Sequence, residues 1–178
     1  MPTRFDAFSR TLHWLMAGLI FFVFAVGLIQ EWMPRNDTRP VVIALHLFGG
    51  TALIGLVALR IFWAFLRKAP AEVAMPRWMA LSSKAAHLLL YGFMLAVPLI
   101  GVWLYGVRGR SYSLFGVPMP MLFEKNDSIR RMVGEVHEVT AYLMMTLVIL
   151  HIGAALYHHI ILKDGLLFRM SGRTPSQR

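Results

Sequence analysis

The sequence contains no cysteine, and only 15% of its 178 residues are charged. The lack of cysteine excludes disulfides, thiolate-held iron–sulfur clusters and covalently attached c-type haem. With 57% hydrophobic residues and a mean hydropathy of +0.59, the chain is too apolar for an ordinary soluble domain of this length. The composition therefore predicts an integral membrane protein.

Four apolar runs are long enough to cross a bilayer, at about 11–29, 42–64, 85–106 and 137–162. A hydrocarbon core of ~30 Å needs about 20 helical residues. Barrel strands would alternate polar and apolar residues, and these runs do not. We therefore predict an all-α membrane protein, with residues 1–178 forming one four-helix transmembrane domain. Pro98 is expected to kink the third helix.

The basic residues that flank these runs predict the orientation. One side, which holds both termini and the 65–84 connection, has eleven Lys and Arg residues against three acids. The other side has seven against six. By the positive-inside rule, both termini face the cytoplasm. The net charge of +9 is mostly this asymmetry, so it gives no reason to expect a nucleic-acid partner.

Two histidines stand fourteen positions apart in the apolar stretch "VHEVTAYLMMTLVILHIG", as His137 and His151. Fourteen helical residues rise ~21 Å and return to within ~40° of the starting face, so both rings point to one side of the helix at two depths. His13 begins the first helix at the inner depth of His151, and His46 begins the second at the outer depth of His137. The sequence therefore predicts two cross-bundle pairs.

Paired imidazoles at two depths limit the kinds of site that these histidines could form. A single histidine near a helix end is commonly an interfacial residue, but ionisable groups inside a membrane are costly and usually functional. Catalysis would need a nucleophile or paired carboxylates, and zinc would need three or four ligands at one depth. Two imidazoles at each depth instead suit two six-coordinate haems b, each iron held from opposite sides.

Other residues near these depths fit the same interpretation. Gly27, Gly49 and Gly50 could let backbone approach a flat macrocycle, or could serve ordinary helix packing. Arg60 lies fourteen residues after His46 and could pair with a haem propionate, or its side chain could reach the cytoplasmic interface.

Several segments resemble the bacterial cytochrome b561 family of four-helix, di-haem membrane proteins. They are "SRTLHWLMAG", "RPVVIALHLFGG", "YGFMLAVPLIGVWL" and "VHEVTAYLMMTLVILHIGAALYHH" followed by "KDGLLFRM". The resemblance covers nearly the whole chain. It implies that His13 and His151 hold an inner haem and that His46 and His137 hold an outer one, which agrees with the pairing by depth.

The resemblance also implies a reaction in a bacterial inner membrane. In the superoxide oxidase type, superoxide gives an electron to the outer haem, which passes it through the inner haem to ubiquinone. A cationic patch in the third connection could attract superoxide, although nearby acids largely neutralise that loop. The candidate cations are Arg108, Arg110, Lys125, Arg130 and Arg131.

Quinone reduction would need polar groups at the inner end. His158 lies seven residues after His151 and should point inward, where it could hydrogen-bond or protonate a quinone oxygen. His87 is the second candidate, whereas His159 is rotated by ~100° and is expected to reach the interface or lipid headgroups. Each of the three could also be an ordinary interfacial histidine.

The connection "APAEVAMPRWMALSSK" is expected to cover this inner site, with Arg77 and Lys84 as available cations. The family tends to place lysines among prolines early in this loop, whereas this chain has Glu72 and Ala74 there. That departure puts a quinone contact from the early part of the loop in doubt.

Two other functions remain open. The chain could be a haem-bearing membrane anchor that links a partner dehydrogenase or hydrogenase to the quinone pool, in which case a redox partner protein would be required. It could also be a helical channel or carrier without haem, which would be colourless after purification.

Overall fold

The computed structural model describes residues 4–67, 70, 73, 75–111, 113–114, 117–118 and 123–171. Four long helices dominate it: α1 (Ala7–Trp32), α2 (Arg39–Leu66), α3 (Arg77–Val107) and α4 (Arg130–Tyr157). A π-helical turn, His158–Leu162, continues α4, and a short α5 (Phe168–Ser171) follows. A small antiparallel hairpin pairs β1 (Ser113–Leu114) with β2 (Val117–Pro118). Three of the eleven basic residues counted above, Lys68, Arg173 and Arg178, lie outside the described residues, as do Glu72 and Ala74.

The predicted four-helix membrane fold is confirmed, because all four long helices are apolar and long enough to span a bilayer. The predicted ranges were too short at the polar ends. α3 begins at Arg77 rather than near 85, and α4 begins at Arg130 rather than near 137. An apolar run marks only the part of a helix suited to lipid, and the helix itself continues into polar sequence.

Local sequence explains several helix ends. Asp6 caps α1, because its carboxylate accepts hydrogen bonds from the Ser9 backbone N–H at 3.0 Å and from the Ser9 hydroxyl at 2.7 Å. Pro76 directly precedes α3, which remains one helix through Pro98. After the π-helical turn, Lys163 adopts a left-handed conformation with φ of 53° and ends the helix.

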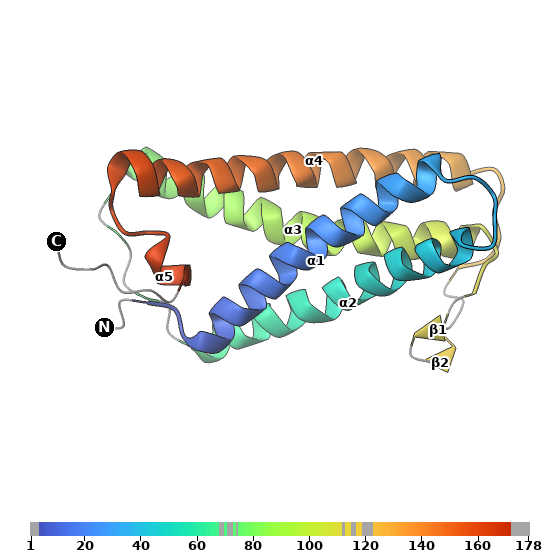
Figure 1. The fold of residues 1–178 in the computed structure, drawn as a ribbon, viewed down its shortest axis with the longest axis horizontal. Coiled ribbons are helices and arrows are strands. Elements are labelled where there is room, and N and C mark those ends of the chain that lie inside the picture. Colours follow the sequence, from blue (N-terminus) through green and yellow to red (C-terminus); the bar gives the residue numbers. More distant parts are fainter. Residues whose placement is uncertain are drawn as a thin grey trace.

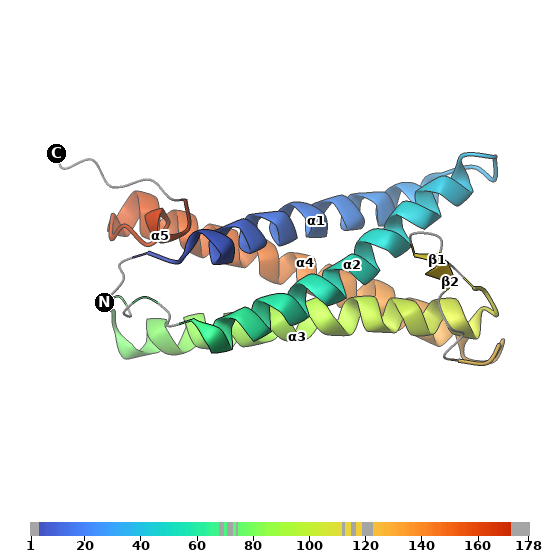
Figure 2. The same cartoon turned by 90° about the horizontal axis from the view of Figure 1, so that it is seen from below.

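The helices pack in sequence order. α1 lies along α2, α3 lies along α4, and α2 joins the two pairs through α3. Figure 2 shows that α2 is close to α1 near their connection and crosses toward α3 at its other end. The buried core lies between the helices and includes Met16, Val57, Met94 and Met144. Only 11–22% of the residues in each spanning window are buried, so the helices keep much of their apolar surface outside the packed core.

The two ends of the bundle differ in content. The start of α1, the end of α2 and α5 lie at one end, and the α1–α2 connection and the β1–β2 hairpin lie at the other (Figure 1). We call these the inner and outer ends, following the predicted orientation. The inner end is tied together by hydrogen bonds from Trp14 Nε1 to the Met170 carbonyl oxygen at 3.0 Å and from the Phe5 N–H to the Arg169 carbonyl oxygen at 3.3 Å.

Candidate functional site

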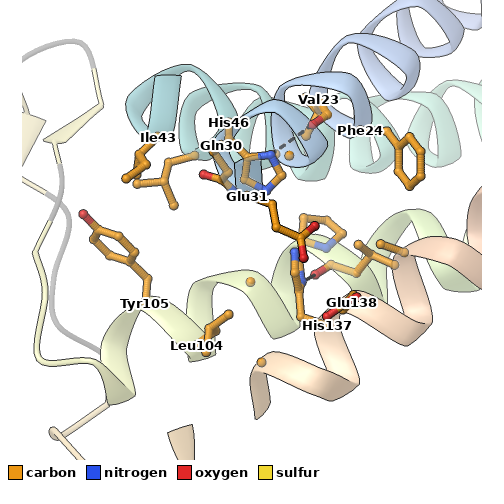
Figure 3. Close-up of a pocket in the computed structure, with 18 of the residues that line it drawn as sticks. Val23, Phe24, Gln30, Glu31, Ile43, His46, Leu104, Tyr105, His137 and Glu138 are labelled. Carbon is orange, nitrogen blue, oxygen red and sulfur yellow. Dashed lines mark hydrogen bonds between the residues drawn. The ribbon is translucent and has the colours of Figure 1, made fainter. Parts of the chain in front are cut away.

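The two outer histidines face each other across the bundle. His46 on α2 and His137 on α4 have ring centroids 6.1 Å apart and ring planes at 83°. Figure 3 shows both imidazoles pointing into one cavity, with the Glu31 carboxylate extending into the same space. The sequence-based pairing by depth therefore corresponds to two rings that are neighbours in space.

Each outer ring is held by a backbone carbonyl of an adjacent helix. His46 Nδ1 lies 3.0 Å from the Val23 carbonyl oxygen on α1, and His137 Nδ1 lies 3.1 Å from the Val97 carbonyl oxygen on α3. A carbonyl oxygen can only accept a hydrogen bond, so each Nδ1 must carry the proton and donate it. The Nε2 atom of each ring is then the one with a free lone pair, which is the state that a metal ligand requires.

The spacing of the rings fits one metal ion held from opposite sides. Two metal–nitrogen bonds of about 2.0 Å, with about 1.1 Å from each ring centre to its nitrogen, separate the centroids by about 6.2 Å. The outer pair has 6.1 Å, and the inner pair, His13 and His151, has 6.4 Å. Both pairs therefore have a donor set and a span that suit an axially ligated haem iron.

A large cavity surrounds the outer pair. It has a volume of about 1110 Å³ and is lined by residues from α1, α2, α3 and α4, including His46 and His137. Its lining combines apolar side chains such as Phe24 and Leu104 with polar side chains such as Tyr105 (Figure 3). A mostly apolar space with a polar rim is suited to a flat cofactor with charged substituents at one edge.

Six arginines line this cavity, and four of them also line a neighbouring space. Arg108, Arg110, Arg130 and Arg131 also form the walls of an adjoining recess of about 300 Å³, which we call the arginine recess. Partial burial, together with the positive charges of Arg110 and Arg130, lowers the pKa of Arg108. The recess is thus crowded with like charges whose repulsion an anion would relieve.

Lys125, the fifth predicted cation, is placed differently. It pairs with Asp127 at 3.1 Å and lines neither the cavity nor the recess. Asp127 also pairs with Arg130 at 3.3 Å. Part of the neutralisation expected for this loop is therefore observed as the Asp127 ion pairs, and Glu135 and Glu138 also line the cavity beside the arginines.

The inner pair has a third imidazole beside it. His13 on α1 and His151 on α4 have ring planes at 70°. The ring centroid of His87 on α3 lies 5.3 Å from that of His151. His87 Nδ1 hydrogen-bonds the Ser83 carbonyl oxygen at 2.7 Å, and the residue is exposed. The prediction that His87 lies at the depth of the inner pair agrees with these contacts.

Arg60 ties three helices together close to the inner end. Its Nε donates to the Tyr91 hydroxyl on α3 at 2.9 Å, and its Nη1 donates to the Ser9 carbonyl oxygen on α1 at 3.1 Å. The side chain is half-buried and so remains within the bundle instead of extending to the interface. Its proposed pairing with a haem propionate stays a prediction.

His158 lies at the end of α4 and is only 8% exposed. Its Nδ1 pairs with the Asp164 carboxylate. Burial acts to raise the pKa of Asp164, but hydrogen bonds from His158 and from the Leu166 N–H outweigh it and lower the pKa. The ionised carboxylate therefore orients the His158 ring.

The remaining inner candidates lie apart from this His–Asp dyad. The ring of His159 packs against Phe168 of α5, with centroids 5.2 Å apart, and its expected reach to the interface or lipid headgroups stays a prediction. Arg77 is exposed in the first turn of α3, and within the described residues no contact joins it to His158. Its role at a quinone site stays a prediction.

The three glycines noted in the sequence have different surroundings. A Cβ on Gly49 would lie 2.4 Å from Val23 Cγ2, so Gly49 allows close packing of α1 on α2. A Cβ on Gly27 would meet the ring of His46, a contact that the sequence did not predict, and the close approach of its backbone to a macrocycle stays a prediction. Gly50 lines the outer cavity and has open space beside it.

Some of the site could not be found from spacing. Sequence spacing does not predict the partners of the candidate residues, which are Asp164, Tyr91, Gly101 and the carbonyl groups of Val23 and Val97. Each of these contacts joins different helices or crosses a turn. Only the nearness of Asp164 to His158 along the chain was a usable signal.

Comparison with known proteins agrees with this architecture. The chain is 29% identical to Cytochrome b561 homolog 1 of Escherichia coli K12, over 94% of this chain and 98% of the relative. It is 28% identical to a protein of Yersinia pestis named Probable superoxide oxidase CybB, over 96% and 97%. It is 29% identical to Cytochrome b562 of Cereibacter sphaeroides, over 90% of each chain. Residues 4–173 match the family described as prokaryotic cytochrome b561, and the chain belongs to this family.

Proposed function

We propose that this protein is a superoxide oxidase that passes electrons from superoxide at the outer end to ubiquinone at the inner end. Family membership implies a multi-pass bacterial membrane redox protein with haem b. The balanced reaction takes two superoxide anions, one quinone and two protons to two molecules of oxygen and one quinol. The inner bacterial membrane is the proposed location, because there the quinone pool meets an outer compartment.

One observation carries the proposal: the bundle has a facing histidine pair toward each end, and the outer pair lies in a cavity that opens at the arginine recess. The two histidines that α4 contributes, His137 and His151, are separated by a helical rise of ~21 Å. Two haems b, when bound, would supply one-electron transfer between these depths. His46 and His137 would hold the outer haem, and His13 and His151 the inner one.

The outer end is suited to a small anion. The four arginines of the recess concentrate positive charge at the cavity mouth, which raises the local concentration of an anionic substrate. Asp127 offsets the charge of Arg130 and Lys125, whereas neither Arg108 nor Arg131 has an acidic ion-pair partner among the described residues. The name of the Yersinia relative supports superoxide as the anion.

The inner end is suited to proton delivery. A quinone that accepts two electrons must also take up two protons. The buried His158 ring, oriented by Asp164, can donate a proton or a hydrogen bond to a quinone oxygen. His87 and Arg77 are further candidates for contact with the quinone, because they lie on the neighbouring α3.

An anaerobic superoxide pulse tests the proposal. The purified protein is oxidised and mixed with superoxide, and reduced b-type haem absorbance and ubiquinol are followed with and without ubiquinone. We expect rapid haem reduction, followed by reoxidation that depends on quinone. Haem that is reduced by dithionite but not by superoxide would contradict the proposal and would favour a membrane anchor that receives electrons from a partner dehydrogenase.

A further inference from the structure

Two glycines lie directly beneath the outer histidine rings. A Cβ built on Gly27 would lie 3.1 Å from His46 Cε1 and 3.3 Å from its Nδ1. A Cβ built on Gly101 would lie 3.0 Å from His137 Cε1 and 3.4 Å from its Nδ1. These separations are shorter than ordinary contacts, so a side chain at either position would push the ring away.

Each of these glycines lies one helical turn after the residue whose carbonyl oxygen accepts a hydrogen bond from the ring. Val23 precedes Gly27 by four residues on α1, and Val97 precedes Gly101 by four residues on α3. Residues four apart lie on one face of a helix, one turn from each other. We call each combination of carbonyl and glycine a histidine seat.

The two seats occur on different helix pairs. The seat on α1 receives His46 from α2, and the seat on α3 receives His137 from α4. The glycine removes the side chain that would separate the ring from the helix backbone. The carbonyl can then accept the Nδ1–H with its second lone pair while it remains part of the helix.

The other histidine pair has no such seat. Among the glycines of the described chain, none would place a Cβ within 4 Å of His13 or His151. Nor does either ring nitrogen of His13 or His151 have a hydrogen-bond partner within the described residues. The seats are therefore a property of the outer pair and are not a general consequence of packing histidines in this bundle.

We propose that Gly27 and Gly101 are positioning residues of the outer iron site, which act by pressing the Nδ1–H of His46 and His137 onto backbone carbonyls. This inference rests on the proposed haem ligation by these two histidines. A strong Nδ1–H hydrogen bond makes the imidazole a better electron donor through Nε2. That donation stabilises ferric iron, so the seats lower the reduction potential of the outer haem.

The test uses Gly27→Ala and Gly101→Ala in the purified holoprotein. Matched controls are Gly18→Ala on α1 and Gly92→Ala on α3, because a Cβ at either position meets nothing within 4 Å. Redox titration and low-temperature EPR spectroscopy would follow both haems. The outer signal is identified as the one missing from His137→Ala.

We expect both seat variants to keep two haems, to raise the midpoint potential of the outer haem and to change its low-spin EPR signal. The inner haem should be unchanged, which also shows that the bundle has folded. The controls should match the wild type at both haems.

An outer haem with unaltered potential and EPR signal in both seat variants would overturn the inference, as would equal disturbance of the two haems. These measurements need no superoxide or quinone. A protein that failed as a superoxide oxidase could therefore still have histidine seats, and the two failures are distinguishable.

Discussion

The outer and inner ends of the bundle surround similar histidine pairs with different chemistry. The outer rings are fixed by backbone carbonyls and lie beside a cationic recess. Around the inner pair are side chains that can exchange hydrogen bonds: Arg60 with Tyr91, His87, and His158 with Asp164. Backbone carbonyls hold a histidine ring in one orientation. Ionisable side chains can instead transfer protons and change their hydrogen bonds when a substrate binds.

This difference matches the two half-reactions proposed for the ends. Superoxide gives up one electron and needs no proton, so an attractive charge and a fixed iron site are sufficient. Quinone needs two electrons and two protons, so titratable groups are required.

The largest expected effect concerns proton delivery at the inner end. His158→Gln should slow ubiquinol formation by about 100-fold, because a positioned general acid contributes at least that much. Haem reduction by superoxide should keep its wild-type rate. His159→Gln is the control, since the His159 ring packs on Phe168 rather than on the dyad. Equal loss in the two variants would mean that the dyad has no special role.

The arginine recess should control the rate at the outer end. The double variant Arg108→Gln, Arg131→Gln should lower the second-order rate constant for superoxide by about tenfold and weaken its dependence on ionic strength. Stopped-flow absorbance of the haem measures this rate. Lys125→Gln removes a cation that pairs with Asp127 outside the recess and should have little effect. If Lys125→Gln slowed the reaction as much, net charge rather than the recess would be responsible.

Arg60 should affect only the inner haem. A nearby cation stabilises the reduced form, so Arg60→Gln should lower the inner midpoint potential and leave the outer one unchanged. Tyr91→Phe removes one hydrogen bond to Arg60 but keeps the charge, and should have a smaller effect. Redox titration of both variants separates the charge from the hydrogen bond, and an unshifted inner haem in Arg60→Gln would argue against propionate pairing.

The smallest expected effect is on stability. Burial acts to raise the pKa of Asp6, but hydrogen bonds from Ser9 and Trp63 outweigh it and lower the pKa. Asp6→Ala should reduce thermal stability in detergent by about 1 kcal/mol through loss of the helix cap. The ionised Asp6 carboxylate contributes to folding stability at any pH above its pKa in the unfolded chain. This contribution is lost as the pH falls through the lower pKa that Asp6 has in the folded protein. Asp6→Ser keeps a capping group and should recover most of the lost stability at neutral pH. If Asp6→Ala were as stable as the wild type, the cap would not be a stabilising feature.

The sequence predicted those parts of the molecule that depend on periodicity along one helix. Hydropathy located the four spans, and the fourteen-residue spacing of His137 and His151 put both rings on one face. The partner of each ring could then be predicted from its depth, because His13 and His46 lie near the starts of helices that begin at opposite ends of the bundle. The start of α3 at Arg77 was missed, since polar helical turns carry no hydropathy signal.

Contacts between helices were harder to predict. The fourteen-residue spacing of Gly27 after His13 predicted the helix face of Gly27. It did not predict the contact with the His46 ring, because the crossing of α1 and α2 decides which side chain meets that face. Asp164 reaches His158 only because the chain turns at Lys163, where the backbone is left-handed. Neither the crossing nor the turn has a periodic pattern in the sequence.

The haem-to-protein ratio of the purified wild-type chain, beside that of His13→Ala and His46→Ala, tests the central claim most directly. Two separate histidine pairs predict two haems b per wild-type chain and one in each variant, with the outer haem kept in His13→Ala and the inner haem kept in His46→Ala. A ratio of one in the wild type, or two haems retained in both variants, would contradict the account.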